Sequence, residues 1–268
     1  MIGKSDWSMI DTYAKSWIKE AGSRIRDSFN KKLLIKTKSN KDDLVTNMDH
    51  ETEQFLISKI TETFPNHQIL GEEGFGDEVK ALDGVVWIID PIDGTMNFVH
   101  QQRNFAISIG IYEDGVGQIG LIYDVVNDEL YHAKKGQGAF FNDTALPALS
   151  DVSVDEAVIG INATWVLENK RIDSSVLTPL VKQVRGTRSY GSAALEMAYV
   201  AAGRLDAYIT MRLAPWDFAA GMILIAEVGG VVTNIKGQPV GLLNESSVFA
   251  SNGNLHKEVM KNYIEGFI

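Results

Sequence analysis

The sequence predicts a mixed α+β protein, with helices layered against antiparallel sheets and the chain divided into two subdomains. Three observations support this. Apolar residues recur every three or four positions in the first 30 residues, short strand-like runs separated by turn pairs fill the middle, and helices and strands alternate in the second half. A weakly patterned stretch follows the last strand of the middle region. We therefore predict an N-terminal subdomain of residues 1–145 and a C-terminal subdomain of residues 146–268.

Two helices separated by a lysine-containing segment are expected at the N-terminus. Apolar residues at helical spacing predict the first helix over residues 6–29, where Ser5 or Asp6 can act as the N-cap. The second helix is predicted over residues 49–64. Between them, residues 31–43 are polar and contain several lysines, and no regular element is predicted there.

The middle of the chain contains a series of short strands. Residues 85–89 are continuously apolar, as expected for a strand buried on both faces. Turn pairs such as Asp114-Gly115 separate the strands that follow, so we predict an antiparallel meander. Its further strands are predicted at residues 105–112, 118–125, 129–133 and 139–142.

Helices and strands alternate after residue 155. The predicted strands are residues 158–161 and 207–211, with two more near Val231 and Val248. The predicted helices are residues 174–184, 192–202, 217–228 and 255–267.

The composition limits the classes of function. Hydrophobic residues make up 45 % of the 268 positions, and the net charge is −10. A net negative charge disfavours general binding to nucleic acids. The absence of cysteine excludes disulfides, thiolate nucleophiles and cysteine-ligated metals. No apolar stretch approaches the roughly 20 residues of a membrane span, and the first nine residues lack the apolar segment of a secretory signal. We therefore expect no membrane partner and a cytoplasmic location.

Residues 115–120 match the pattern G-x-G-x-x-G of dinucleotide-binding folds. In those folds the motif follows a strand and opens a helix. Here the next residues read as a strand, so we interpret the glycines as part of a hairpin. A nucleotide-binding module remains an alternative that a titration with NAD(P) in the absence of metal would test.

The strongest chemical signal is the segment Trp-Ile-Ile-Asp-Pro-Ile-Asp-Gly-Thr at residues 87–95. An apolar strand ends at Asp90, and Asp93 follows across a turn, so both carboxylates can converge on one cation. Gly94 permits a close backbone approach, and Thr95 can begin a helical turn whose free N–H groups attract an anion. On its spacing alone, the segment is equally consistent with a simple turn.

Further acidic residues lie at the ends of expected elements. Glu72 lies between glycines in Gly-Glu-Glu-Gly, Asp217 precedes an apolar helix, and Asp49 begins the second helix. Each alone has a structural explanation, as a solvated loop or a helix cap. Together the acids form an all-oxygen ligand set, which favours Mg²⁺, Mn²⁺ or Ca²⁺ over zinc.

This combination of motifs resembles that of the inositol monophosphatase family. It comprises W-I-I-D-P-I-D-G-T-x-N-F with a preceding G-E-E-G and a downstream W-D-x-A-A-G, and D-L-V-T-x-x-D and R-x-Y-G-S-A-A-L extend it over nearly the whole chain. The resemblance implies a layered αβαβα sandwich, a homodimer, and Mg²⁺-dependent, lithium-sensitive hydrolysis of a small phosphomonoester. The first candidate substrate is inositol 1-phosphate, and the alternatives are the 2′-phosphate of NADP(H) and fructose 1,6-bisphosphate.

The resemblance also implies a set of metal ligands. Glu72, Asp90 and the carbonyl of Ile92 would hold one Mg²⁺. Asp90, Asp93 and Asp217 would hold a second, and Glu72 would also contact a third, weaker ion. Mn²⁺ would be able to replace Mg²⁺, whereas Ca²⁺ and Li⁺ would inhibit.

Catalytic roles follow from the same resemblance. Thr95, oriented by Asp49, would help Glu72 to position and deprotonate the attacking water. The backbone N–H groups of Gly94 and Thr95 would bind the phosphate. The lysine segment would close over the site, with Lys36 nearest the metals, although a solvated basic loop is the simpler interpretation. Some bacterial relatives contact the transcription machinery, which leaves a regulatory role as the non-enzymatic alternative.

The resemblance implies that substrate specificity depends on one departure from the family pattern. Inositol-specific relatives carry an acidic residue seven positions before the aspartate of the W-D motif, and this chain has Thr210 there. Losing a charged acceptor weakens recognition of ring hydroxyls, because such hydrogen bonds contribute ~1.5–3 kcal/mol. Arg188 and Arg212 are candidates for binding an additional phosphate. The implied substrate-binding residues are Asp93, Gly94, Thr95, Arg188, Gly191, Ser192, Ala193, Thr210 and Asp217.

Overall fold

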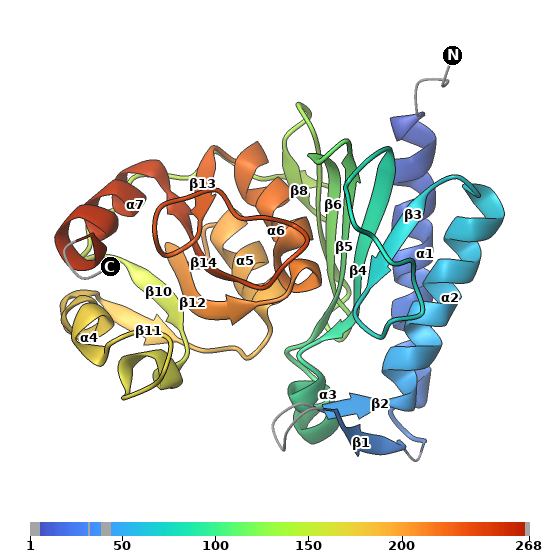
Figure 1. Cartoon of the computed structure of the whole chain (residues 1–268), viewed down its shortest axis with the longest axis horizontal. Coiled ribbons are helices and arrows are strands. Elements are labelled where there is room, and N and C mark those ends of the chain that lie inside the picture. The colour runs from blue at the N-terminus through green and yellow to red at the C-terminus, as the bar shows by residue number, and fades with distance from the viewer. Residues whose placement is uncertain (1–5, 32, 39–43, 266–268) are drawn as a thin grey trace.

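The computed structural model describes residues 6–31, 33–38 and 44–265, and these form five alternating layers of helices and sheets (Figure 1). The helices are α1 (Trp7–Ser28), α2 (Asn47–Thr63), α3 (Thr95–Gln101), α4 (Ser174–Gln183), α5 (Ala193–Ala201), α6 (Pro215–Glu227) and α7 (Gly253–Val259), with a 3₁₀ helix at Ala163–Val166 and a π-helical turn at Met260–Ile264. None of the helices in these ranges combines the length and the apolar character needed to cross a membrane.

Two large sheets form the second and fourth layers. The seven-stranded sheet has the order β3 (Gln68–Gly71), β4 (Val85–Asp93), β5 (Ala106–Glu113), β6 (Val116–Asp124), β7 (Glu129–Lys134), β8 (Ala139–Phe141) and β9 (Thr144–Ala145). The five-stranded sheet has the order β11 (Gly186–Arg188), β10 (Val158–Ile161), β12 (Ala207–Leu213), β14 (Ser246–Asn252) and β13 (Gly230–Thr233). A separate antiparallel pair consists of β1 (Ile35–Thr37) and β2 (Leu44–Thr46).

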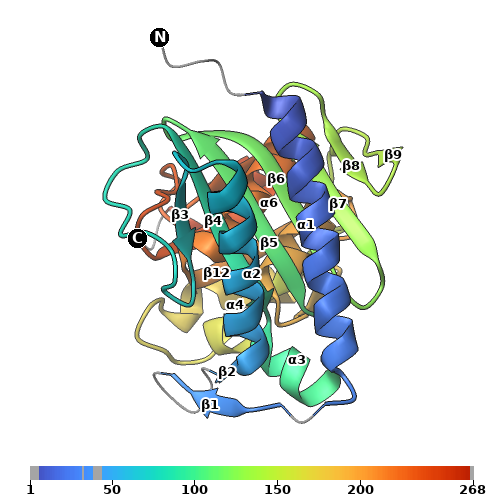
Figure 2. The ribbon, with the colours of Figure 1, turned by 90° about the vertical axis from the view of Figure 1, so that its right-hand side faces the viewer.

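Alternation along β4 explains why the first sheet carries helices on both faces. Every residue of this strand is buried. Trp87 and Ile89 pack with helices α1 and α2, which lie over one face of the sheet (Figure 2). Val86 and Ile88 point to the opposite face and pack with α5 and α6. The apolar run therefore predicted a strand buried on both faces correctly.

The second sheet completes the sandwich. Its face toward the middle of the molecule shares the α5–α6 core through Tyr208, Val248 and Ala250. Its other face packs with α4 and α7 through Ile209 and Phe249. The predicted αβαβα sandwich is confirmed, and the G-x-G-x-x-G segment forms the turn and first half of β6 rather than a helix start.

The predicted antiparallel meander is confirmed from β4 to β8, but the sheets are not antiparallel throughout. The first sheet is antiparallel from β4 onward, but β3 pairs with β4 in parallel, and β10 pairs in parallel with both β11 and β12. The parallel partners of β10 are reached through α4 and α5, because a parallel connection needs a crossover rather than a tight turn. The β1–β2 pair was also not predicted. Strand β1 lies in the lysine segment, where it is exposed at every position and shows no alternation, and β2 directly follows that segment.

The structure bears on two predicted boundaries, the limits of the last helix and the division between the subdomains. The last helix was predicted over residues 255–267, but α7 begins at Gly253 and passes into a π-helical turn at Met260, and residues 266–268 lie outside the described part of the chain. The division after residue 145 falls directly after β9. However, α6 packs on strands of both sheets, so two subdomains remain a prediction.

Candidate active site

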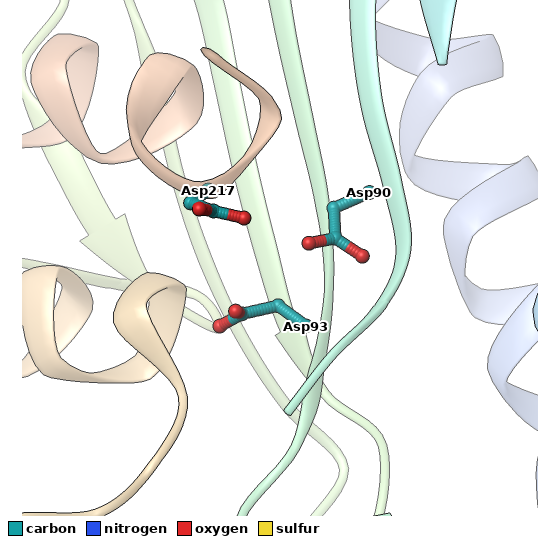
Figure 3. A group of neighbouring side chains, drawn as sticks. All are labelled: Asp90, Asp93 and Asp217. Atoms are coloured by element: carbon teal, nitrogen blue, oxygen red, sulfur yellow. The ribbon is translucent and has the colours of Figure 1, made fainter. Parts of the chain in front are cut away.

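Three aspartates that are distant in sequence converge between the first sheet and helix α6. Asp90 and Asp93 lie at the end of β4, and Asp217 lies in the first turn of α6. One carboxylate oxygen from each lies within 4.8 Å of the other two. Figure 3 shows Asp90 and Asp217 pointing toward one another, with Asp93 beside them. The two β4 aspartates are buried, with 1 % and 7 % of their surface exposed.

A β-bulge places Asp90 and Asp93 together. In a regular strand, residues three apart point to opposite faces. Here Asp90 pairs with Ser108 of β5 and Asp93 pairs with Ala106, so β4 has one extra residue between these pairs. Pro91 lies in this bulge and has no N–H to donate to the neighbouring strand. The D-P-x-D spacing therefore brings both carboxylates to one side.

Local hydrogen bonds orient Asp90 and Asp217. Oδ1 of Asp90 accepts the Ile92 N–H at 3.0 Å, within its own turn. Oδ2 of Asp217 accepts the Ala214 N–H at 2.8 Å and thereby caps α6. The N-cap of α6 is therefore Ala214 rather than Asp217, which completes the cap from the third position of the helix through one of its two oxygens.

Asp93 is held by the second half of the chain. Its Oδ2 accepts a short hydrogen bond from the Ser192 hydroxyl and a second from the Ala194 N–H at 2.7 Å. These donors lie at the start of α5, which follows the glycine turn at Gly191. The segment Gly191–Ala193 therefore adjoins Asp93, as expected for residues of one site.

The close packing of buried carboxylates in this cluster favours the binding of a cation. Burial raises the pKa of Asp90 well above its ordinary value, and the nearby charges of Glu72, Asp93 and Asp217 raise it further. Burial also raises the pKa of Asp93 to about 6, against the hydrogen bonds that lower it. Buried carboxylates at this spacing repel one another unless a proton or a positive ion neutralises them. The convergent oxygens suit a hard divalent cation such as Mg²⁺, so the residues fit the predicted metal.

Glu72 lies beside this cluster, just after the end of β3. The Nζ of Lys38 is 2.9 Å from Oε1 of Glu72 and also bonds to Glu73. Burial lowers the pKa of Lys38, but these two glutamates outweigh it and raise the pKa overall. The prediction named Lys36 as the lysine nearest the metal ligands, and this was wrong by two positions. Lys36 lies within the exposed strand β1, whereas Lys38 follows that strand and reaches the acids.

Thr95 and Asp49 are in contact, as their proposed pairing requires. The Thr95 hydroxyl lies 3.0 Å from Oδ1 of Asp49 and 3.0 Å from the Ile92 carbonyl oxygen. The other oxygen of Asp49 accepts the Thr46 N–H and the Thr46 hydroxyl at the start of α2. Asp49 is fully buried, and burial raises its pKa.

A cavity of about 620 Å³ opens beside Asp93. The predicted residues Gly191, Ser192, Ala193 and Thr210 line it, and so does Arg212. Arg188 does not line it, because its strand β11 lies at the edge of the second sheet and its guanidinium bonds to the adjacent Thr187 carbonyl. The binding of an additional phosphate by Arg188 stays a prediction. The sequence reasoning also missed other lining residues, including Asn162, Trp165, Glu196 and Tyr208.

With this geometry established, comparison with known proteins decides the family. A profile of the inositol monophosphatase family matches residues 6–265. The chain belongs to the inositol monophosphatase family. It is a phosphomonoester hydrolase of that family, as the resemblance of its motifs implied.

Several relatives of this family member are closely similar. Inositol-1-monophosphatase of Bacillus subtilis (strain 168) is 65 % identical over 260 residues, covering 97 % of this chain and 98 % of the relative. A crystal structure of the Staphylococcus aureus enzyme SaIMPase-II with inositol monophosphate bound has a TM-score of 0.87 at 43 % identity and covers 96 % of this chain and 94 % of its own. An inositol monophosphatase/NADP phosphatase solved with Mg²⁺ and phosphate has a TM-score of 0.88 at 28 % identity, covering 96 % and 95 %.

Two further residues of this family member touch the site region without having been predicted. Residues two apart in a strand lie on the same face, so Lys36 and Lys38 were equally good candidates for contact with the acids. Glu53 lies one helical turn after Asp49 on α2 and is fully buried. An acidic residue at an apolar position of a helix was a signal for Glu53, because such residues are rarely buried without partners.

Proposed function

We propose that this chain hydrolyses inositol 1-phosphate to inositol and phosphate with the aid of Mg²⁺. The observation that carries the proposal is the convergence of the Asp90, Asp93 and Asp217 carboxylates beside a cavity large enough for a small ligand. The similarity to a bacterial inositol-1-monophosphatase at 65 % identity supports inositol 1-phosphate as the first candidate.

Five residues would hold the metal ions. Glu72, Asp90 and the Ile92 carbonyl would bind one, and Asp90, Asp93 and Asp217 a second, with a third, weaker ion near Glu72. When bound, Mg²⁺ supplies activation of a water at neutral pH and neutralisation of charge on the phosphate and the leaving oxygen. We expect Mn²⁺ to substitute and Ca²⁺ and Li⁺ to inhibit.

The Thr95 hydroxyl is positioned to accept a hydrogen bond from the attacking water. Thr95 has one hydroxyl proton, which it donates to Asp49 or to the Ile92 carbonyl. Its lone pairs then remain available to accept a hydrogen bond from a water molecule between Thr95 and Glu72. Asp49 stays oriented for this role because Thr46 occupies its second oxygen. We therefore assign the positioning of water to Thr95 and Asp49, and its deprotonation to Glu72.

Phosphate and substrate would bind between β4 and the start of α5. Gly94 has a φ of 95°, and a Cβ there would lie 3.2 Å from the carbonyl oxygens of Asn104 and Gly191, so glycine is required at this turn. We assign phosphate binding to the N–H groups of Gly94 and Thr95. Contacts to the rest of the substrate fall to Ser192, Ala193 and Thr210 in the adjoining cavity.

The same cavity favours one alternative substrate. Thr210 is uncharged, and Arg212 and Trp165 line the cavity with it. A cation and an aromatic ring suit a nucleotide that bears additional phosphate, such as NADP, and one related structure is that of an inositol monophosphatase/NADP phosphatase. Fructose 1,6-bisphosphate would use the same cation.

A substrate panel tests the proposal. Released phosphate is measured for inositol 1-phosphate, NADP and fructose 1,6-bisphosphate, with Mg²⁺ and with EDTA. We expect Mg²⁺-dependent release, with the highest kcat/KM for inositol 1-phosphate. Metal-independent release, or no release from any of the three, would contradict the proposal.

The assembly and location of the protein stay predictions. We expect a cytoplasmic homodimer, which sedimentation equilibrium of the purified protein would show at twice the 29.5 kDa chain mass. A pull-down with the Asp90→Asn variant would separate a regulatory partner from catalysis, because it removes a metal ligand and leaves the surface unchanged.

A further inference from the structure

Glu72 differs from the other acids of the site in how it is held. Asp90, Asp93 and Asp217 each accept at least one backbone N–H through their own carboxylates. Glu72 begins an irregular loop after β3, and its side chain bonds to the Lys38 ammonium. Its backbone N–H donates to the Ile89 carbonyl at 3.2 Å, which fixes only the start of the loop.

Further along this loop, one buried carboxylate accepts two backbone N–H groups. Oε2 of Glu53 accepts the Glu73 N–H at 2.8 Å, and Oε1 accepts the Phe75 N–H at 3.0 Å. Glu53 has no exposed surface, so water does not compete for these bonds. These two bonds fix the backbone at the first and third residues after Glu72.

Gly71 brings the loop against the same carboxylate from the other side. A Cβ at position 71 would lie 2.6 Å from the carboxyl carbon of Glu53, which is closer than such atoms approach. Glu53 therefore contacts the residue before Glu72 and bonds to the residue after it.

Helix α2 thereby reaches the site at two points. Asp49 in its first turn bonds to Thr95, and Glu53 one turn later bonds to the loop of Glu72. Both side chains are buried on the face of α2 that meets the sheet. The two elements that flank the aspartate cluster are thus positioned by one rigid helix.

We propose that Glu53 is a positioning residue that fixes Glu72 in the geometry needed to bind a divalent cation. This rests on the proposed function in one respect, namely that Glu72 is a metal ligand. Groups that orient metal ligands change metal affinity by about 10–100-fold when they are replaced. In a Glu53→Gln variant, the side-chain NH₂ group would face one of the two loop N–H groups. Two donors cannot bond to each other, so that hydrogen bond would be lost.

Calorimetric titration of Mg²⁺ into the Glu53→Gln variant tests the proposal without relying on catalysis. We expect the apparent Kd for Mg²⁺ to rise by about 10–100-fold, while the KM for substrate at saturating Mg²⁺ stays unchanged. The matched control is Glu51→Gln, on the same helix, where the carboxylate is exposed and accepts a hydrogen bond from the Asn47 side chain. Its Kd should stay within about twofold of the parent value. A Glu53→Gln variant that binds Mg²⁺ as tightly as the parent would overturn the proposal.

Gly71→Ala provides a second route if the Gln variant fails to fold. The added methyl group displaces the Glu53 carboxylate without removing it. We expect the same loss of Mg²⁺ affinity, and an unchanged Kd in this variant would also overturn the proposal. A parent protein that binds Mg²⁺ but releases no phosphate from any ester would contradict the proposed function alone, because the Kd comparison would stand.

Discussion

The buried aspartate cluster should make the stability of the metal-free protein fall as the pH rises. In the fold, the pKa of Asp93 is raised from 3.8 to about 6, because burial disfavours its charged form. A group with a raised pKa stabilises the fold below its unfolded pKa, and this contribution is lost as the pH rises through the folded pKa. The difference of 2.2 corresponds to about 3 kcal/mol at full ionisation. The raised pKa values of Asp90 and Asp217 add to this in the same direction.

Urea unfolding at pH 5 and pH 8, each with EDTA and with saturating Mg²⁺, measures this effect. The difference between the Mg²⁺ and EDTA curves cancels groups outside the site. We expect Mg²⁺ to stabilise the protein more at pH 8 than at pH 5, by about 1.4 kcal/mol from Asp93 alone, because pH 5 lies one unit below the folded pKa of about 6. At 100 times its Kd, a ligand that binds only the folded state adds about 2.7 kcal/mol in total. A tightly bound ion at high concentration is therefore needed to see the full effect.

The Asp93→Asn variant serves as the control for this measurement. It removes one charge while an amide oxygen can still accept the bonds from Ser192 and Ala194. With EDTA at pH 8 it should be more stable than the parent, and Mg²⁺ should stabilise it less. Equal stabilisation of the parent by Mg²⁺ at both pH values, with Asp93→Asn indistinguishable from it, would refute the electrostatic argument.

Four further changes have defined outcomes. Asp90→Asn should abolish Mg²⁺-dependent phosphate release while circular dichroism shows an intact fold, and retained turnover would exclude Asp90 as a shared ligand. Thr210→Glu should raise kcat/KM for inositol 1-phosphate relative to NADP by about tenfold or more, since a hydrogen bond to a charged group contributes ~1.5–3 kcal/mol; an unchanged ratio would remove this position from the specificity argument. Lithium at millimolar concentrations should inhibit phosphate release, and indifference to it would contradict the expected lithium sensitivity. Trp87→Ala should lower the free energy of unfolding by about 3–5 kcal/mol in urea titrations, because the ring is fully buried and its Nε1 donates to His67; a loss below about 1 kcal/mol would contradict the packing described for β4.

Much of the secondary structure could be predicted because it depends on local patterns. Helix α1 runs from Trp7 to Ser28 against a predicted range of 6–29, and β10 has the predicted bounds 158–161. The antiparallel pairing of the meander was also predicted, because short turns join its strands, but the parallel pairing could not be predicted in the same way. The parallel partners of β10 are set by crossovers through α4 and α5, and a strand's own residues do not specify its neighbours.

The site was predictable to different extents along the chain. Asp90 and Asp93 lie in one short motif, whose spacing indicated that both carboxylates could converge but did not exclude a simple turn. Asp217 joins them only through the tertiary fold, and the family resemblance rather than the spacing indicated it. Glu53 and Lys38 were missed because their roles depend on where the loop after β3 lies. That placement follows from long-range packing of α2 against the sheet.

A crystal of the protein soaked in Mn²⁺, with anomalous diffraction measured, would test the central claim most directly. Mn²⁺ scatters anomalously and accepts the oxygen ligands that Mg²⁺ prefers. The expected result is anomalous density bounded by the carboxylates of Asp90, Asp93 and Asp217, and its loss from the same position in Asp90→Asn crystals. Density that appears only at other sites, or that survives this substitution unchanged, would contradict it.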